Sequence, residues 1–106
     1  MQEKEIEKVL MQEVRKLGGR AYKWVSPGND GVPDRIVVFP NQCPIFVELK
    51  SETGRLTSLQ EIQIKRLRDL GQYVEVVKGM KGVADFFLDI GYAQTARRLR
   101  DRYDLW

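Results

Sequence analysis

Two short apolar segments, residues 35–39 and 45–47, constrain the fold of this chain more than any other feature. Both are rich in β-branched and aromatic side chains, which is typical of β-strands. The residues between them, Pro40-Asn41-Gln42-Cys43-Pro44, are turn formers, so we expect an antiparallel hairpin centred near Asn41. Each strand carries apolar residues on both faces, which indicates a sheet that is covered on both sides.

Charged residues lie at the open end of this hairpin. In the expected register Asp34 lies opposite Glu48, with Cβ atoms roughly 4.5–5.5 Å apart. Lys50 projects to the same face, because side chains alternate along a strand. Two carboxylates this close repel each other, and a divalent cation bound to their oxygens relieves the repulsion. We therefore assign Asp34 and Glu48 as metal ligands, and Lys50 as the group that activates water or stabilises charge on a phosphate.

The sequence does not fix this register. A slip of one residue would send the two acids to opposite faces, and the same residues would then form an edge hairpin with a solvated charged face. The loop from Gly28 to Pro33, just before Asp34, favours the first reading, because its Gly and Pro residues suit a close approach of the backbone.

The motif Pro33-Asp34…Glu48-Leu49-Lys50 resembles that of the PD-(D/E)xK nuclease superfamily. Over residues 3–78 the chain resembles its VRR-NUC branch. The segments that carry this resemblance are Lys23 to Gly28, Gly31 to Arg35, Val47 to Lys50 and Leu56 to Gln60. It implies a restriction-endonuclease-like fold and a Mg²⁺- or Mn²⁺-dependent endonuclease acting on structured DNA. Stand-alone members of this size resemble Holliday-junction resolvases of phages and bacteria. The rival function is a non-catalytic DNA-binding module with the same fold.

The resemblance also implies three further site residues. The main-chain carbonyl of Leu49 is expected as a metal ligand, and Gln60 is expected to point from its helix towards the site. Similar nucleases carry a glutamate on the first helix near the metal, which corresponds to Glu7 here. Helical spacing alone places Glu3 and Glu13 nearer the apolar stripe, so it does not select Glu7. The number of metal ions stays open.

Four residues flank the expected centre and are candidates for contacts with DNA phosphates, which position DNA without reading its sequence. They are Lys23, Ser26, Arg35 and Arg55. Trp24 is expected either to stack on a base or to join the core. Basic clusters elsewhere suit either a phosphate backbone or a solvated helix face. These clusters are Arg15, Lys16, Arg20 and Lys23; Lys65, Arg66 and Arg68; and Arg97, Arg98, Arg100 and Arg102.

Composition excludes several kinds of chemistry. With no histidine and one cysteine, Cys43, the chain lacks Ser-His and Cys-His catalytic groups, an ordinary protein zinc site and an internal disulfide. Acid–base chemistry then rests on carboxylates, lysines, tyrosines or metal-bound water, and we expect no organic cofactor. The charged N-terminus lacks the apolar segment of a secretion signal, and no apolar run is long enough to cross a bilayer. We therefore expect an intracellular protein that does not associate with membranes.

The order of expected elements is typical of an α/β domain with a mixed sheet flanked by helices. A helix over 3–17 and a strand over 20–25 precede the hairpin, and a helix that Thr57 or Ser58 caps runs to Leu70. The strand over 73–77 follows a crossover long enough for parallel pairing. The result is one domain of 106 residues in the order α-β-β-β-α-β-α, with a nuclease core over 3–78.

The region 80–106 is expected to form a C-terminal extension of one or two short helices. Its apolar residues at helical spacing suit either packing onto the domain or a dimer contact. Because cleavage of a junction requires two cuts, we expect a two-fold homodimer with two sites.

Overall fold

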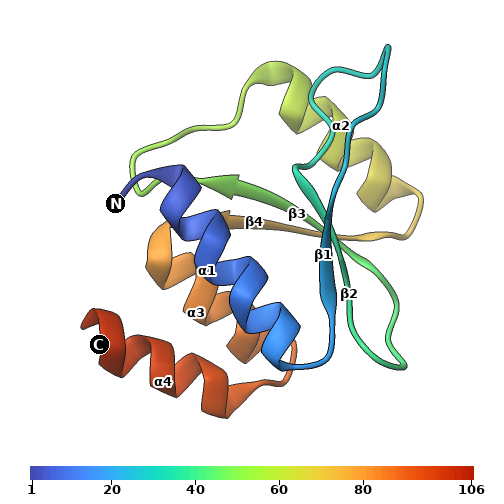
Figure 1. Ribbon diagram of the computed structural model, residues 1–106. Coiled ribbons are helices and arrows are strands. Elements are labelled where there is room, and N and C mark those ends of the chain that lie inside the picture. The colour runs from blue at the N-terminus through green and yellow to red at the C-terminus, as the bar shows by residue number, and fades with distance from the viewer.

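The computed structural model describes all 106 residues, and its elements follow in the order α-β-β-β-α-β-α-α. Their bounds are α1 (Glu3–Lys16), β1 (Arg20–Lys23), β2 (Arg35–Val38), β3 (Ile45–Lys50), α2 (Ser58–Asp69), β4 (Tyr73–Lys78), α3 (Gly79–Asp89) and α4 (Ala93–Tyr103). The four strands form one sheet in the order β1-β2-β3-β4. β2 pairs antiparallel with both β1 and β3, whereas β3 and β4 are parallel. The predicted α/β class and mixed sheet are confirmed (Figure 1).

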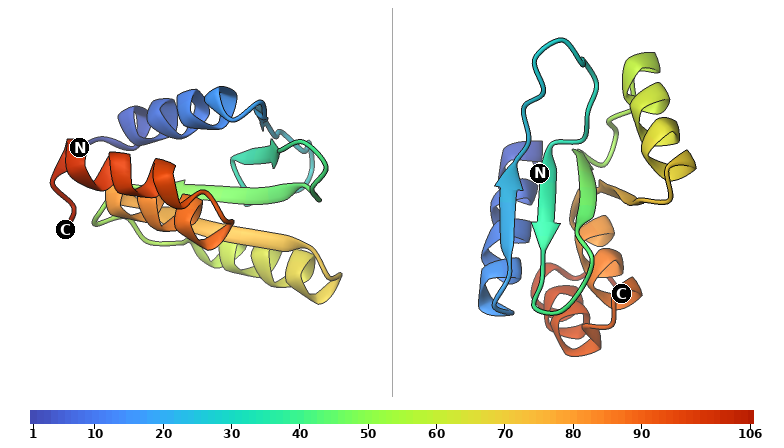
Figure 2. Two further views of the ribbon diagram at one scale, coloured as in Figure 1. Left: turned by 90° about the horizontal axis from the view of Figure 1, so that it is seen from below. Right: turned by 90° about the vertical axis from the view of Figure 1, so that its right-hand side faces the viewer.

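Helices cover the two faces of the sheet unequally. α1 and α2 lie on opposite sides of it (Figure 2, left). On the α1 face, apolar residues of the sheet join those of three helices in one buried core. That core contains Ile6, Leu10 and Val14 of α1, Val37, Val47 and Leu49 of the sheet, Val83 and Phe87 of α3, and Ala96 and Leu99 of α4. The α1 stripe that spacing predicted is therefore the face that packs on the sheet.

α2 packs mainly against β4, at the other edge of the opposite face, and its Gln60 reaches Glu48 on β3. Of the apolar residues of this helix and its C-cap, only Ile64 is buried, and Leu59, Ile62 and Leu70 are exposed. No helix lies in front of β1 and β2 in the view of Figure 2 (right), and Tyr22 of β1 is exposed. The sheet is thus fully covered on one face and half covered on the other, which corrects the prediction of two covered faces.

The segment that follows β4 forms two helices, α3 and α4. α4 packs on α3, and the buried carboxylate of Glu13 on α1 forms an ion pair with Arg98 of α4 and another with Lys16. Burial alone would raise the pKa of Glu13, but the bonds and charges of Arg98 and Lys16 outweigh it and hold that pKa below its usual value of 4.5. Of the two predicted uses of the final helix, packing onto the domain is therefore observed. No helix is long and apolar enough to cross a membrane.

Candidate active site

The predicted register of the hairpin is confirmed. β2 and β3 pair with Arg35 opposite Val47 and Ile36 opposite Phe46. One step further along the same register places Asp34 opposite Glu48, on the face that α2 covers. Lys50 shares that face, because it lies two residues beyond Glu48. Both acids and the lysine therefore meet at one end of the sheet, as the spacing of the motif predicted.

Asp34 is held in place by main-chain bonds on both sides. Its Oδ2 accepts a hydrogen bond of 2.9 Å from the backbone N–H of Leu49, and its carbonyl oxygen accepts one of 3.0 Å from the N–H of Trp24. The regular pairing of β2 with β3 begins only at Arg35. The Asp34 side chain therefore accepts the hydrogen bond of the Leu49 N–H, which lies on β3 just beyond the last regular pair. Its carboxylate is consequently fixed between the ends of three strands.

Glu48 is the most unusual side chain of the protein. Its carboxylate is buried (residue 1 % exposed), and Oε2 lies 3.1 Å from the amide nitrogen of Gln60 and 3.5 Å from Nζ of Lys50. Its other oxygen, Oε1, is the one buried side-chain nitrogen or oxygen without a hydrogen-bond partner. Burial, followed by repulsion from Asp34, raises the pKa of Glu48 to about 7, although Lys50 opposes the shift. The positive charge of Lys50 therefore does not fully offset the two neighbouring carboxylates.

A divalent cation fits this deficit. Two carboxylates face each other, one of them has an unused buried oxygen, and oxygen atoms are the ligands that Mg²⁺ and Mn²⁺ prefer. No group of three or more His, Cys, Asp and Glu residues comes together elsewhere or here. Protein side chains would thus supply two ligands, and Mg²⁺ in particular is commonly bound by one or two carboxylates plus water and substrate phosphate.

The amide of Gln60 is oriented by the helix that carries it. Thr57 caps α2: its Oγ1 accepts a bond from the N–H of Gln60, and the Gln60 Oε1 accepts a bond of 2.9 Å from the N–H of Thr57. This reciprocal arrangement is a capping box. Because Oε1 is occupied, the side-chain NH₂ is the group turned towards Glu48. The predicted direction of Gln60 is therefore observed, and the helix cap accounts for it.

The loop before Asp34 rests directly on the first turn of α2. Gly31 has φ +90°, and a Cβ atom placed there would lie 2.6–2.8 Å from backbone atoms of Leu59 and Gln60. Only glycine allows both the conformation and the contact. Gly28, in the same loop, has φ +82° but nothing within 4 Å of such a Cβ. The close backbone approach that the sequence predicted therefore occurs at Gly31, where it joins the Asp34 loop to the helix of Gln60.

Glu7 does not join Asp34 and Glu48 in a carboxylate cluster. Its Oε2 accepts a bond of 3.1 Å from Nε of Arg35, whose Nη1 also donates to the carbonyl of Ala21. Arg35 points to the α1 face, since its strand neighbour Asp34 points to the α2 face. Glu7 is thus linked to the site only through Arg35, the chain neighbour of Asp34. The Arg35 side chain is 12 % exposed, and two of its nitrogens already donate hydrogen bonds within the protein.

The other predicted DNA contacts lie in different surroundings. Lys23 is exposed at the end of β1, and the Ser26 hydroxyl accepts a bond from Asn29 within the loop. Arg55 lines a pocket of about 380 Å³ together with Lys50 and Lys78. Trp24 is half-buried and its ring lies 5.2 Å from that of Phe46.

Sequence reasoning missed Lys78. This residue pairs in register with Lys50, and both line the pocket that also contains Arg55. The signal was present, because parallel pairing of the strand over 73–77 with the second hairpin strand would have brought its C-terminal lysine beside Lys50. Lys50, whose ammonium lies 3.5 Å from Glu48, consequently shares this pocket with two further cations and with Glu61.

Comparisons with known proteins agree with this geometry. Residues 1–81 match the model of the VRR-NUC domain family. A protein described as "Putative nuclease p44", from Acyrthosiphon pisum secondary endosymbiont phage 1, is 51% identical over 77 residues, which are 73% of this chain and 83% of that protein. A solved structure described as a VRR_NUC domain superposes with a TM-score of 0.75 at 29% identity, covering 85% of this chain and 97% of the other. On these grounds the chain belongs to the VRR-NUC family of nuclease domains.

Proposed function

We propose that this protein is a divalent-metal-dependent DNA endonuclease that hydrolyses phosphodiester bonds of branched DNA such as Holliday junctions. The observation that carries the proposal is the buried, partnerless Oε1 of Glu48 beside Asp34. Burying a carboxylate without a partner is costly, and such groups are concentrated at functional sites. Membership of the VRR-NUC family and the nuclease description of the phage relative support the same activity.

In this proposal Asp34, Glu48 and the main-chain carbonyl of Leu49 hold Mg²⁺ or Mn²⁺. A bound ion of this kind acts as a Lewis acid towards the phosphodiester and promotes ionisation of water. Lys50, whose ammonium lies 3.5 Å from Oε2 of Glu48, stabilises negative charge that develops on the phosphate. Gln60 holds the Glu48 carboxylate through Oε2 and leaves Oε1 available. A direct catalytic role for Glu7 stays a prediction, because its partner in this structure is Arg35.

DNA contacts are proposed for Lys23, Ser26 and Arg55, and for Arg35 through the guanidinium nitrogen that Glu7 and Ala21 leave unused. Contacts of this type are made to phosphates and do not read base sequence. We further propose a homodimer, because two cuts in a junction require two sites, which a two-fold axis would relate.

Two substitutions test the site. Asp34→Asn and Glu48→Gln are expected to lower the rate of junction cleavage with Mg²⁺ or Mn²⁺ by at least about a hundredfold, the order of effect of removing a charged group from such a centre. Titration of Mn²⁺, followed by electron paramagnetic resonance of the free ion, is expected to show weaker binding to both variants. Asp30→Asn, which alters an exposed acid of the same loop, serves as the control and should change neither measurement.

Cleavage at the parent rate by either site variant would show that the assignment is wrong. If the parent protein binds junctions tightly but never cuts them in Mg²⁺ or Mn²⁺, a non-catalytic DNA-binding module is the correct description.

A further inference from the structure

We propose that a groove between α1 and β1 binds the sugar–phosphate backbone of a DNA duplex arm beside the one that is cut. This inference rests on the proposed nuclease function. The groove consists of two adjoining pockets, of about 310 and 90 Å³, that share Met11 and Arg15. The larger pocket is lined by α1 alone, and the smaller one lies between α1 and the exposed edge strand β1.

The charge of this groove is its most distinctive property. Four cations line it, and none of them forms an ion pair within the protein: Lys4, Lys8, Arg15 and Arg20. The single carboxylate, Glu7, is bound to Arg35. Four cations against one acid give a formal charge of +3, which equals the formal net charge of the whole chain. The remainder of the molecule therefore has a formal charge of zero, although it also contains cations outside any ion pair.

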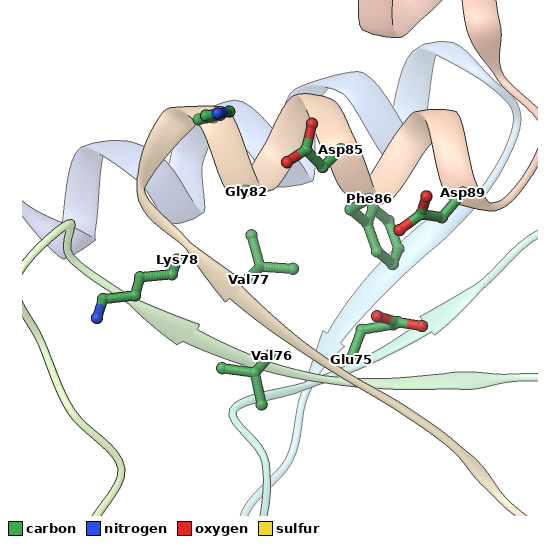
Figure 3. A pocket seen from close by; sticks show the side chains of 9 residues that line it. Glu75, Val76, Val77, Lys78, Gly82, Asp85, Phe86 and Asp89 are labelled. Carbon is green, nitrogen blue, oxygen red and sulfur yellow. The ribbon is translucent and has the colours of Figure 1, made fainter.

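The other side of the molecule provides the contrast. A pocket of about 360 Å³ lies between β4 and α3, and three carboxylates line it with two lysines (Figure 3). Glu75, Asp85 and Asp89 are labelled there, and such a lining repels phosphate. The formal charge of this lining is −1, against +3 for the groove, so a polyanion is attracted more strongly to the groove than to this pocket.

The spacing of the cations matches a duplex. Lys4, Lys8 and Arg15 recur at helical intervals along one stripe of α1. From Lys4 to Arg15 the helix advances by about 16 Å, and one DNA strand carries a phosphate for each 3.4 Å of rise, so about five phosphates face this length. Arg20 extends the line onto β1.

The groove extends towards the end of the sheet that carries the candidate active site, on the opposite face. Glu7 forms part of its wall and holds Arg35, the chain neighbour of Asp34. The N-terminal amine of Met1, which lies two residues before α1, is 3.7 Å from the carboxylate of Glu52, two residues beyond Lys50. A duplex arm along α1 therefore reaches the same end of the sheet as the two carboxylates. A branched substrate supplies a second arm of this kind, and an unbranched one does not.

Salt dependence of binding tests the assignment. The variant with Lys4, Lys8, Arg15 and Arg20 all changed to Gln would be titrated against a fluorescent four-way junction in EDTA, which prevents hydrolysis, between 50 and 200 mM salt. The logarithm of the binding constant falls linearly with the logarithm of the salt concentration. Each lost phosphate contact makes this negative slope shallower by about 0.9, so the loss of four makes it shallower by about 3.6. The ratio of variant to parent Kd should then be about 150-fold larger at 50 mM than at 200 mM.

The matched control removes the same charge elsewhere, by changing four exposed residues outside any ion pair to Gln: Arg66, Lys81, Arg97 and Arg102. Its slope should stay within about 0.9 of the parent value. An equal fall in slope for both variants would overturn the proposal, since net charge alone would then explain binding. Binding of phosphatidylserine vesicles that only the groove variant loses, with junction binding intact, would overturn it in favour of a membrane surface.

The outcome is separable from that of the nuclease proposal. Even if the parent protein never cuts DNA, the groove variant can still show a shallower salt dependence than the parent in EDTA, and this result supports the groove. A groove variant that keeps the parent slope refutes it even if the parent cuts junctions efficiently.

Discussion

Substitution of Gly31 by alanine tests whether contact between the Asp34 loop and α2 supports the site. Two costs arise. A residue with a side chain in the left-handed region at φ +90° costs about 1–2 kcal/mol. The new Cβ would also lie 2.6 Å from the carbonyl carbon of Leu59 and 2.8 Å from the nitrogen of Gln60, both backbone atoms, and overpacking of this kind costs about 1–3 kcal/mol. We therefore expect the free energy of unfolding to fall by about 2–5 kcal/mol.

Gly28→Ala is the matched control. Gly28 lies in the same loop with a similar φ of +82°, but nothing would lie within 4 Å of its Cβ. Both variants carry the same backbone strain and the same loss of freedom in the unfolded chain. The difference between them isolates the contact with α2, at about 1–3 kcal/mol. In a domain of this size that corresponds to roughly 4–12 °C in Tm.

Urea denaturation and thermal melts of the two variants would measure this difference. A movement of the first turn of α2 also displaces Gln60, which donates to Glu48. Mn²⁺ affinity should therefore fall in Gly31→Ala and stay near the parent value in Gly28→Ala. If the two variants are equally stable to within about 0.5 kcal/mol, the loop does not rest on the helix as described.

Two further predictions concern buried carboxylates. Gln60→Glu keeps a capping residue but turns an acceptor towards Glu48, so the metal-free protein should lose about 1–3 kcal/mol in urea denaturation. Gln94→Glu, at an exposed position without a side-chain hydrogen bond, should change stability by less than about 0.5 kcal/mol, and equal effects would contradict this reasoning. Glu13→Gln should lower the free energy of unfolding by about 2 kcal/mol at pH 7, because the ion pair with Arg98 is lost. Since the folded pKa of Glu13 lies below 4.5, this deficit should shrink as the pH falls below 4.5. The exposed Glu3→Gln should show no such deficit, and a Glu13→Gln deficit that is independent of pH would refute the ionic explanation.

The hairpin was predictable from sequence because two local signals agree, the strand-forming residues and the turn between them. The turn centred near Asn41 favours the register in which Asp34 faces Glu48, and the observed pairs select that register over a slip of one residue. Asn41 itself adopts a positive φ of 58°, which Asn tolerates better than most residues. The burial of Glu48 did not follow from the sequence. It depends on α2 lying over the end of β3, and α2 is placed by the chain after Lys50.

The surface of α2 shows where local pattern fails. Apolar residues on a helix predict a buried stripe, but the width of that stripe depends on how much sheet lies beneath the helix. α2 contacts β4 at the edge of the sheet, so Ile64 is buried, and Ile62 and Leu70 remain exposed. No property of residues 58–69 alone reports that β1 and β2 stay uncovered.

The acid of the first helix illustrates the same limit. Glu3, Glu7 and Glu13 all lie on α1, and helical spacing did not select among them. The structure separates them by their partners: Glu13 is buried with Arg98 on the far helix, Glu3 is exposed, and Glu7 holds Arg35. Arg35 is separated from Glu7 by 28 positions in the chain, and Arg98 is separated from Glu13 by 85 positions. Since Arg35 and Asp34 are neighbours that point to opposite faces of β2, a change at Glu7 reaches the carboxylate pair through the strand itself, and the position of Asp34 depends on both faces of the sheet.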